Sequence, residues 1–257
     1  MKKNLILPLK GSLAAAFTAF FLASSPTQAA EKVVVSVPPL HSLVSNLLTG
    51  IAEPGLLITE SAALTAAPDR ARIDAAGMVV WTGPAYEQGL AGVRAADPTV
   101  SAKGLTLSTT LPLLSFADPS RPDMSTGVQD MRFWLDPRLA KVAVGRIAPN
   151  LIRVFPEQSD QILENEIRLK KRLMALEARM RQALESFPGV PLHVTESDVL
   201  YLAWRFNLAV PNCPAAARIA EGFALETGTE PGAALYFAMM EIILGELRRC
   251  QAVQEMM

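Results

Sequence analysis

The sequence contains few of the residues on which most catalytic and metal sites depend. Its 257 residues include two histidines and two cysteines, and aromatic residues make up 6% of the chain. It has no Gly-x-Ser-x-Gly elbow, no glycine-rich phosphate loop and no Cys-x-x-Cys pair. These absences argue against serine-hydrolase, phosphoryl-transfer and thiol-redox chemistry, and we expect the protein not to be an enzyme.

The sequence also lacks an excess of either charge. Its 24 Lys and Arg residues face 25 Asp and Glu residues, which gives a formal net charge of −1. A protein that binds nucleic acid or an anionic membrane surface through its overall charge is strongly basic. We therefore expect neither nucleic acid nor an anionic membrane surface as a partner.

The first 29 residues have the three parts of a secretory signal peptide. Residues 1–10 contain three lysines and no acid, residues 13–23 (LAAAFTAFFLA) are apolar, and small residues lead up to Ala29. An apolar run of this length is too short to span a bilayer as a standard helix. We predict a signal peptide over 1–29 and export to the periplasm, against the alternative of an uncleaved membrane anchor. No later stretch is long and apolar enough for a transmembrane segment.

The two cysteines are Cys213 and Cys250. Disulfides form in exported proteins, so a bond between these two is the first expectation, and two free thiols in a core are the alternative. Such a bond would close a loop of nearly forty residues. On the chain-entropy model, it would stabilise the protein by about 4 kcal/mol.

The sequence of the N-terminal half predicts alternating strands and helices. Continuous apolar runs at 32–37 (KVVVSV), 55–59 (GLLIT) and 77–81 (GMVVW) indicate strands that are buried on both faces. Helical patterns follow each of them, at 40–48, 68–76 and 86–96. This alternation is typical of an α/β fold with a mainly parallel sheet flanked by helices. Residues 97–130 are rich in Pro and Gly and indicate loops, with one short edge strand at 105–107.

The longest run without an internal proline or any glycine predicts one long helix over 156–187. Pro156 suits a helix start, and Pro188-Gly189 ends the pattern. Its apolar residues form one helical stripe: Ile162, Leu169, Leu173, Leu176, Met180, Leu184 and Phe187. A helix of this length spans roughly 45 Å. It is either a surface helix or short coiled coil, or a rod that joins two lobes.

Shorter elements are expected on both sides of this helix. Asp136-Pro137 has the chemistry of a helix N-terminus and predicts a helix over 138–154. After the long helix, we expect a strand at 191–195 and helices at 198–206 and 233–250. Residues 209–231 show no strong period.

In this order, the segments resemble a known family. The sequence VVVSVPPLHSLVSNLLTG is followed by LLIT, GMVVWTGPAYE and FWLDPRLAK, then by the long helix, WRFNLAV and TGTEPGAALYFAMMEIILGELRRC. Together they resemble the periplasmic solute-binding protein of zinc and manganese ABC importers, and its zinc-specific, ZnuA-like branch most of all. The resemblance covers most of residues 31–208 and 228–251.

The resemblance implies a fold, a cargo and a partner. The family has two α/β lobes joined by one long helix, which here implies lobes over 30–155 and 188–257 and a linker helix over 156–187. The C-terminal lobe is shortened, because several tens of the family's residues are missing between Leu208 and Glu226. A zinc ion in the cleft between the lobes is delivered to a permease in the inner membrane. The resemblance also implies the Cys213–Cys250 disulfide.

The family's three-histidine zinc site does not match this sequence. The loop that should carry the first histidine, 59–67, has none and contains Glu60. Arg132, which cannot bind a metal, stands at the second position, and Glu196 stands at the third. Only His41 and His193 are present in the chain, so a three-histidine site cannot form in one copy. The cofactor expected from the resemblance is therefore zinc or none.

Several interpretations of these positions stay open. Arg132 and Glu196 could form an ion pair that replaces the metal, because buried charges require partners. Glu60, Glu196 and His41 could form a weak oxygen-rich metal site, although Arg132 would repel a cation at short range. His41 and His193 are each more simply explained as structural histidines.

These residues lead to a functional hypothesis with two alternatives. The first is a periplasmic solute-binding protein for metal ion transport in a zinc ABC importer, with the usual three-histidine site degenerate. The second is a periplasmic accessory or scaffold protein that derives from this family and binds no metal. The third is a remnant whose shortened C-terminal lobe folds poorly.

Overall fold

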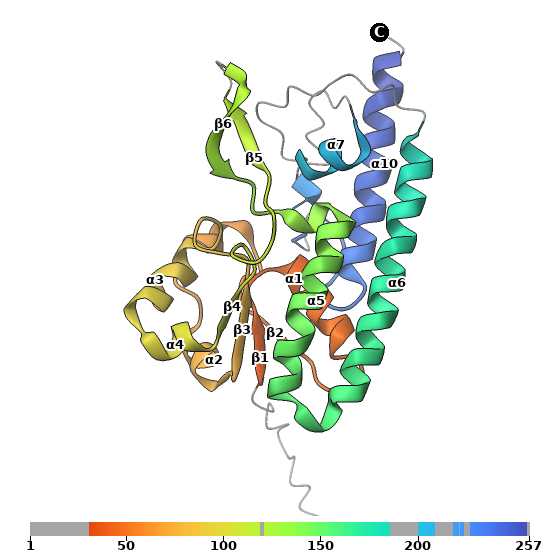
Figure 1. Ribbon diagram of the computed structural model, residues 1–257. Helices are drawn as coiled ribbons and strands as arrows, with labels where there is room; N and C mark the ends of the chain where they lie inside the picture. The colour runs from red at the N-terminus through yellow and green to blue at the C-terminus, as the bar shows by residue number, and fades with distance from the viewer. Residues whose placement is uncertain are drawn as a thin grey trace, which may run out of the picture.

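The structure is a computed structural model that describes residues 31–118, 121–185, 200–208, 218–220, 222–223 and 227–255 (Figure 1). The predicted signal peptide and the strand expected at 191–195 lie outside these ranges, as do His193, Glu196 and Cys213. Among the described helices, none combines the length and apolar composition that a membrane span requires.

A four-stranded parallel sheet forms the centre of the N-terminal half. Its strands are β1 (Val33–Val35), β2 (Gly55–Leu56), β3 (Met78–Trp81) and β4 (Gly104–Thr106), in the spatial order β2-β1-β3-β4. Val34 pairs with Gly55 on one side and with Val79 on the other. The valines of β1 are at most 1% exposed, as expected for strands covered on both faces. The three predicted strands and the edge strand are confirmed.

Helices cover both faces of this sheet. One side carries α2 (Arg70–Ala75), α3 (Gln88–Ala96) and α4 (Pro98–Ala102), and the other carries α1 (Pro38–Leu47) (Figure 1). The helix predicted from residue 40 begins two residues earlier, because prolines are tolerated in a first turn. Helix α4 lies where loops were expected, with the side chain of Asp97 accepting a hydrogen bond from Thr99 N at 2.8 Å. A short 3-10 helix, η1 (Ser61–Leu64), precedes α2.

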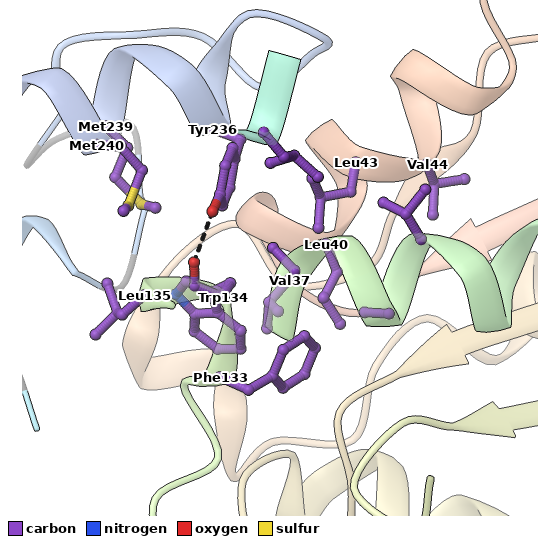
Figure 2. Close-up of a cluster of buried hydrophobic side chains, with 14 of the residues drawn as sticks. Val37, Leu40, Leu43, Val44, Phe133, Trp134, Leu135, Tyr236, Met239 and Met240 are labelled. Atoms are coloured by element: carbon purple, nitrogen blue, oxygen red, sulfur yellow. Dashed lines mark hydrogen bonds between the residues drawn. The ribbon is translucent and has the colours of Figure 1, made fainter. Parts of the chain in front are cut away.

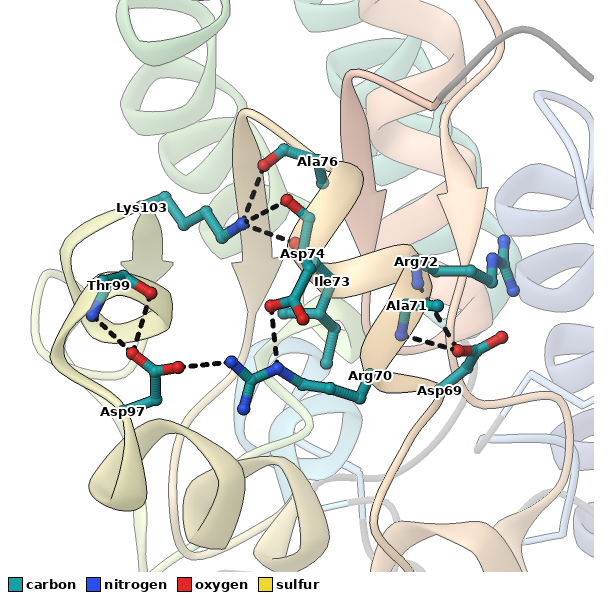
Figure 3. A network of polar contacts seen from close by, with 10 residues as sticks. All are labelled: Asp69, Arg70, Ala71, Arg72, Ile73, Asp74, Ala76, Asp97, Thr99 and Lys103. Carbon is teal, nitrogen blue, oxygen red and sulfur yellow. Dashed lines mark hydrogen bonds and ion pairs between the residues drawn. The ribbon is translucent and has the colours of Figure 1, made fainter.

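A polar network fixes α2 and α4 at the edge of the sheet (Figure 3). The Lys103 ammonium donates to the carbonyl oxygens of Ile73 (2.6 Å), Asp74 (3.1 Å) and Ala76 (2.9 Å), at the end of α2. Arg70 pairs with Asp74 at 2.7 Å and also contacts Asp97. Lysine at a helix C-terminus satisfies carbonyls that have no partner within the helix. This cluster is therefore structural, with its charges already paired.

Two long helices pack against each other in antiparallel directions. Helix α5 (Pro137–Val154) is followed by the 3-10 turn η3 (Pro156–Gln158) and by α6 (Ser159–Leu184) (Figure 1). As predicted, Pro137 is the first residue of α5, and the Asp136 side chain caps it by accepting from Arg138 N at 2.8 Å. The stripe of α6 from Ile162 to Leu184 is buried against α5, α1 and the C-terminal helix α10 (Leu235–Glu255). The long helix and the α/β fold class are thus confirmed.

A β-hairpin lies where the sequence indicated loops. Strands β5 (Ser115–Asp118) and β6 (Arg121–Gln129) pair antiparallel. They extend beyond the parallel sheet at the same end of the molecule as helix α7 (Leu200–Phe206) (Figure 1). Pro122 lies within β6, which is possible because a two-stranded ribbon has only edge strands. The register shifts between Ser115 and Asp118. The regular alternation of residues that marks a strand is therefore not visible in the sequence.

One hydrophobic core connects the sheet to the C-terminal helix. The 3-10 turn η2 (Phe133–Leu135) lies between α1, α7 (Leu200–Phe206) and α10 (Leu235–Glu255). Figure 2 shows Phe133 and Trp134 packed below Leu40 and Leu43 of α1, with Tyr236 of α10 above them. Met239 and Met240, both fully buried, complete this cluster. The turn therefore joins segments that are far apart in sequence.

Candidate functional site

The crevice at the carboxyl end of the sheet is filled by the protein's own carboxylate. In a doubly wound sheet, ligands bind where the strand order reverses, which here is between β1 and β3. Glu87 lies there and is fully buried. Its Oε1 accepts from Ser36 Oγ (2.6 Å) and Thr82 N (2.9 Å), and its Oε2 accepts from Gly83 N (2.8 Å). Burial raises the pKa of Glu87, while these donors act against the rise.

Sequence reasoning did not find Glu87. The available signal was an acid shortly after a buried strand, in the segment TGPAYE. All of its bonds come from donors, so the carboxylate holds the chain ends after β1 and β3 together. We interpret Glu87 as the residue that fixes this edge of the sheet.

His41, a candidate ligand, is buried in α1. Its ring is 6% exposed, and Nε2 lies 2.9 Å from the carbonyl oxygen of Pro54. A carbonyl only accepts, so Nε2 carries the proton, and buried Nδ1 has no partner within the described chain. Burial lowers the pKa of His41, against the Pro54 bond and the charges of Glu53 and Glu31. This is the arrangement of a structural histidine that holds the segment before β2.

Glu60, another candidate ligand, stands at the start of η1 and is exposed. Its carbonyl oxygen accepts from Ala63 N at 3.1 Å, which forms the turn. The third candidate, Glu196, lies outside the described residues. The structure therefore does not test whether Glu60, Glu196 and His41 come together.

Arg132 forms a buried ion pair with a residue that the sequence analysis did not consider. Its guanidinium binds both carboxylate oxygens of Asp130, Nε to Oδ1 at 2.9 Å and Nη2 to Oδ2 at 3.2 Å. The backbone N of Arg132 also donates to Oδ1 at 2.9 Å. Asp130 is 2% and Arg132 8% exposed. The predicted Arg132–Glu196 pair stays a prediction, because Glu196 is not described.

Tyr201 of α7 holds this ion pair in place. Its hydroxyl donates to the Asp130 carbonyl at 2.7 Å and accepts from Leu114 N at 3.1 Å. Asp130 N in turn donates to the Leu114 carbonyl at 2.9 Å, which closes the base of the β5–β6 hairpin. Burial raises the pKa of Tyr201 above its usual range, so the hydroxyl keeps its proton. The side chain thus ties α7 to the loop that carries Arg132.

The turn that follows is bonded to three later segments. Asp136, fully buried, accepts from Arg205 Nε of α7 at 2.8 Å, and a second bond joins the same two side chains. Trp134 Nε1 donates to the Ala220 carbonyl at 2.9 Å. The Tyr236 hydroxyl donates to the Trp134 carbonyl at 2.8 Å (Figure 2). The loop is therefore fixed by three segments of the C-terminal half of the chain.

The described residues do not form a zinc site of the kind the resemblance implies. Within them, no group of three or more His, Cys, Asp or Glu side chains is placed to hold a metal ion. The Cys213–Cys250 disulfide also lies outside what the structure describes.

Comparison with known proteins gives one family. The family model of "Zinc-uptake complex component A periplasmic" matches residues 33–243. The high-affinity zinc uptake system protein ZnuA of Brucella abortus is 26% identical, over 76% of this chain and 71% of that protein. ZnuA of Brucella melitensis matches to the same extent.

Solved structures share the fold. A crystal structure of ZnuA superposes with a TM-score of 0.60 at 19% identity, covering 85% of this chain and 98% of that one. The solute-binding protein FpvC of Pseudomonas aeruginosa, solved in complex with Mn²⁺, gives a TM-score of 0.62 at 17% identity. That match covers 87% of this chain and 99% of FpvC. At these identities, the likeness concerns the fold alone.

Proposed function

Because the chain belongs to the family of the periplasmic zinc-uptake component ZnuA, we propose that it is a solute-binding protein of a zinc ABC importer with a degenerate zinc site. In this role, zinc is a cargo that passes to a permease in the inner membrane, and no covalent reaction takes place. Residues 1–29 direct export to the periplasm. Lobes over 30–155 and 188–257 are joined by the helix at 156–187.

The Asp130–Arg132 ion pair carries this proposal. Arg132 stands at the position where the resemblance places the second histidine, and a guanidinium has no lone pair to give to a metal. The two Asp130 carboxylate oxygens and the Tyr201 hydroxyl hold this loop in a buried, hydrogen-bonded arrangement. Buried charges are kept only where such partners compensate them. The position is thus built around an internal cation.

The remaining candidates bind a metal weakly. Asp130 already neutralises Arg132, so an additional contact from Glu196 would give this cluster a net negative charge. A cation nearby would then meet carboxylate oxygens from Glu196 and Glu60, with His41 as the only described imidazole. Zinc prefers nitrogen and sulfur ligands in tetrahedral geometry. Two carboxylates and one imidazole meet this preference poorly.

The same ion pair favours a second candidate function. If internal ion pairs occupy the positions of the metal ligands, the protein can have the fold of the family and bind no metal. We therefore retain the alternative of a periplasmic accessory or scaffold protein that derives from this family and binds no metal.

Calorimetry and thermal melting after chelation distinguish these functions. A solute-binding protein with a degenerate site gives weak heats with Zn²⁺ or Mn²⁺ and a rise in Tm only at high metal concentration, because a ligand that binds the native state stabilises it. The double variant Arg132→His with Glu196→His should bind Zn²⁺ at least about tenfold more tightly. No heat and no change in Tm in the wild-type protein would favour the accessory function.

A further inference from the structure

The α5–α6 helix pair carries a charge that the whole chain does not. Helix α5 contains four basic and no acidic residues, and α6 contains six basic and four acidic residues. The pair therefore has a formal charge of +6, in a chain whose total is −1. A local field of this size attracts anionic groups, and salt screens it.

The outer face of the same pair exposes large apolar side chains. Leu163, Ile167 and Met174 of α6 are 45%, 55% and 55% exposed, and Val142 of α5 is 39% exposed. The three α6 residues are spaced by four and seven positions, so they share one face of that helix. Apolar residues in line on a basic surface are typical of a recognition surface.

A groove with a volume of about 890 Å³ runs between the start of α5 and the end of α6. Two carboxylates, Glu177 and Glu185, belong to its lining, so its formal charge is +1. Met174, Leu184 and Phe206 give it an apolar lining, and Arg138, Lys141 and Arg181 line it as cations. We define these six residues as the basic groove. Tyrosine, tryptophan, phenylalanine, methionine and arginine are the residues enriched in protein interfaces, and the groove contains three of these types.

One carboxylate organises the cations of the basic groove. Glu177 accepts from Arg138 Nε at 2.6 Å and from Arg181 Nη2 at 2.9 Å. Burial acts to raise the pKa of Glu177, but the bonds from Arg181 and Arg138 lower it overall, so the carboxylate stays charged. The two guanidiniums share one negative charge and keep the capacity to bind another anion. Lys141, on the adjacent turn of α5, adds a third cation.

We propose that the basic groove binds an acidic, amphipathic helical segment of a partner protein. The lining along α6 from Met174 to Leu184 covers eleven residues, which is roughly 15 Å or nearly three turns of a docked helix. Apolar side chains of that segment contact Met174 and Phe206, and its carboxylates meet Lys141 and the two arginines. This is the helix-in-groove mode of recognition. It does not depend on whether the chain binds a metal.

The hollow shape favours a protein segment over a membrane surface. An anionic bilayer is contacted by a convex or flat amphipathic face whose apolar side chains reach outward. Here Leu184 and Phe206, which line the groove, are 2% and 9% exposed and do not project outward as contact with a bilayer requires.

Fluorescence anisotropy with defined peptides tests this proposal. The probe is a labelled peptide of about 15 residues, with leucines at helical spacing on one face and glutamates elsewhere. A second peptide has lysine in place of glutamate. Lys141→Glu is the main variant, because Lys141 has no ion pair with other described residues to lose. Arg153→Glu, at the far end of α5 and outside the groove, is the matched control with the same change in charge.

The proposal expects the acidic peptide to bind and the basic peptide not to bind. Lys141→Glu should weaken binding about tenfold, whereas Arg153→Glu should change it about twofold or less. Met174→Ser should also weaken binding, while Tm and far-UV circular dichroism stay unchanged in all three variants.

Three results would overturn the proposal. The first is no binding of the acidic peptide to the wild-type protein, and the second is equal loss with Lys141→Glu and Arg153→Glu. The third is binding to phosphatidylethanolamine–phosphatidylglycerol vesicles that Lys141→Glu abolishes, in the absence of peptide binding, which would assign the surface to a membrane.

Discussion

Three buried carboxylates that could ligate a metal are bonded instead to donors of their own chain. Glu87 binds a hydroxyl and two backbone N–H groups, Asp130 binds Arg132, and Asp136 binds Arg205 and the start of α5. Each carboxylate is at most 2% exposed. At the scale of residues, the site is therefore a set of internal ion pairs and caps. The sequence revealed Arg132 as an anomaly, but it did not reveal the local partner two residues away.

Asp130→Asn should destabilise the protein by about 3 kcal/mol, because it removes the charged carboxylate that Nε and Nη2 of the buried Arg132 bind. Urea unfolding followed by circular dichroism measures this change. Asp74→Asn is the control, since it removes a carboxylate from an exposed pair and should cost below about 1 kcal/mol. Equal effects of the two substitutions would contradict a special role of the buried pair.

His41 should make stability depend on pH. Burial lowers its pKa in the folded state below the ordinary value of 6.5. The unfolded chain therefore takes up this proton first, and the free energy of unfolding falls as the pH drops below about 6.5 toward the lower, folded-state pKa. In His41→Gln, which keeps a donor for the Pro54 carbonyl, the loss of stability on acidification should be smaller. An unchanged slope between neutral and mildly acidic pH would count against this assignment.

At the scale of elements, the sequence predicted those helices and strands correctly whose structure depends on one type of residue. Continuous valines predicted β1 and β3, and Asp136-Pro137 predicted the first turn of α5. Sequence analysis did not predict the β5–β6 hairpin. A ribbon of edge strands tolerates Pro122, and the register shift removes the alternation of apolar and polar residues that marks a strand. Sequence analysis also missed α4, a single capped turn that is too short to show a helical period.

Gly145→Ala should stabilise α5 by roughly 0.5–1 kcal/mol through its greater helix propensity. The added Cβ would lie 3.2 Å from Lys170 Nζ, the mobile end of a long side chain that can shift. Thermal melting of the variant measures the effect. A decrease in Tm would show that Lys170, paired with Glu166, does not shift to make room for the added methyl group.

At the scale of the whole molecule, the segment just before α10 is bonded to α1, near the opposite end of the chain. Asn46 Nδ2 and Ser42 Oγ both donate to the Ala233 carbonyl, at 2.7 and 3.1 Å, and Arg172 of α6 donates to Asn46 Oδ1 at 2.7 Å. The sequence could not predict this contact, because Ser42 and Asn46 look like the solvated face of α1. The division into two lobes was proposed from the resemblance. These bonds connect α1, in the N-terminal half, with α6 and with the segment before α10.

The protein should therefore unfold in one transition. Circular dichroism and tryptophan fluorescence should give coincident curves, because Trp134 lies in the core that both halves share. Asn46→Ala should lower the free energy of unfolding by about 2 kcal/mol, since it removes the amide that donates to the Ala233 carbonyl and accepts from the charged Arg172. Two separate transitions in the wild-type protein would contradict a shared core.

We propose that the chain has the zinc-importer fold without the family's zinc site. Competition of the metal-free protein with a zinc chelator, at nanomolar free Zn²⁺, measures this directly. The claim predicts that the wild-type protein takes up no zinc under these conditions and that chelation leaves its Tm unchanged. Uptake of one equivalent of Zn²⁺ at nanomolar free concentration would contradict it.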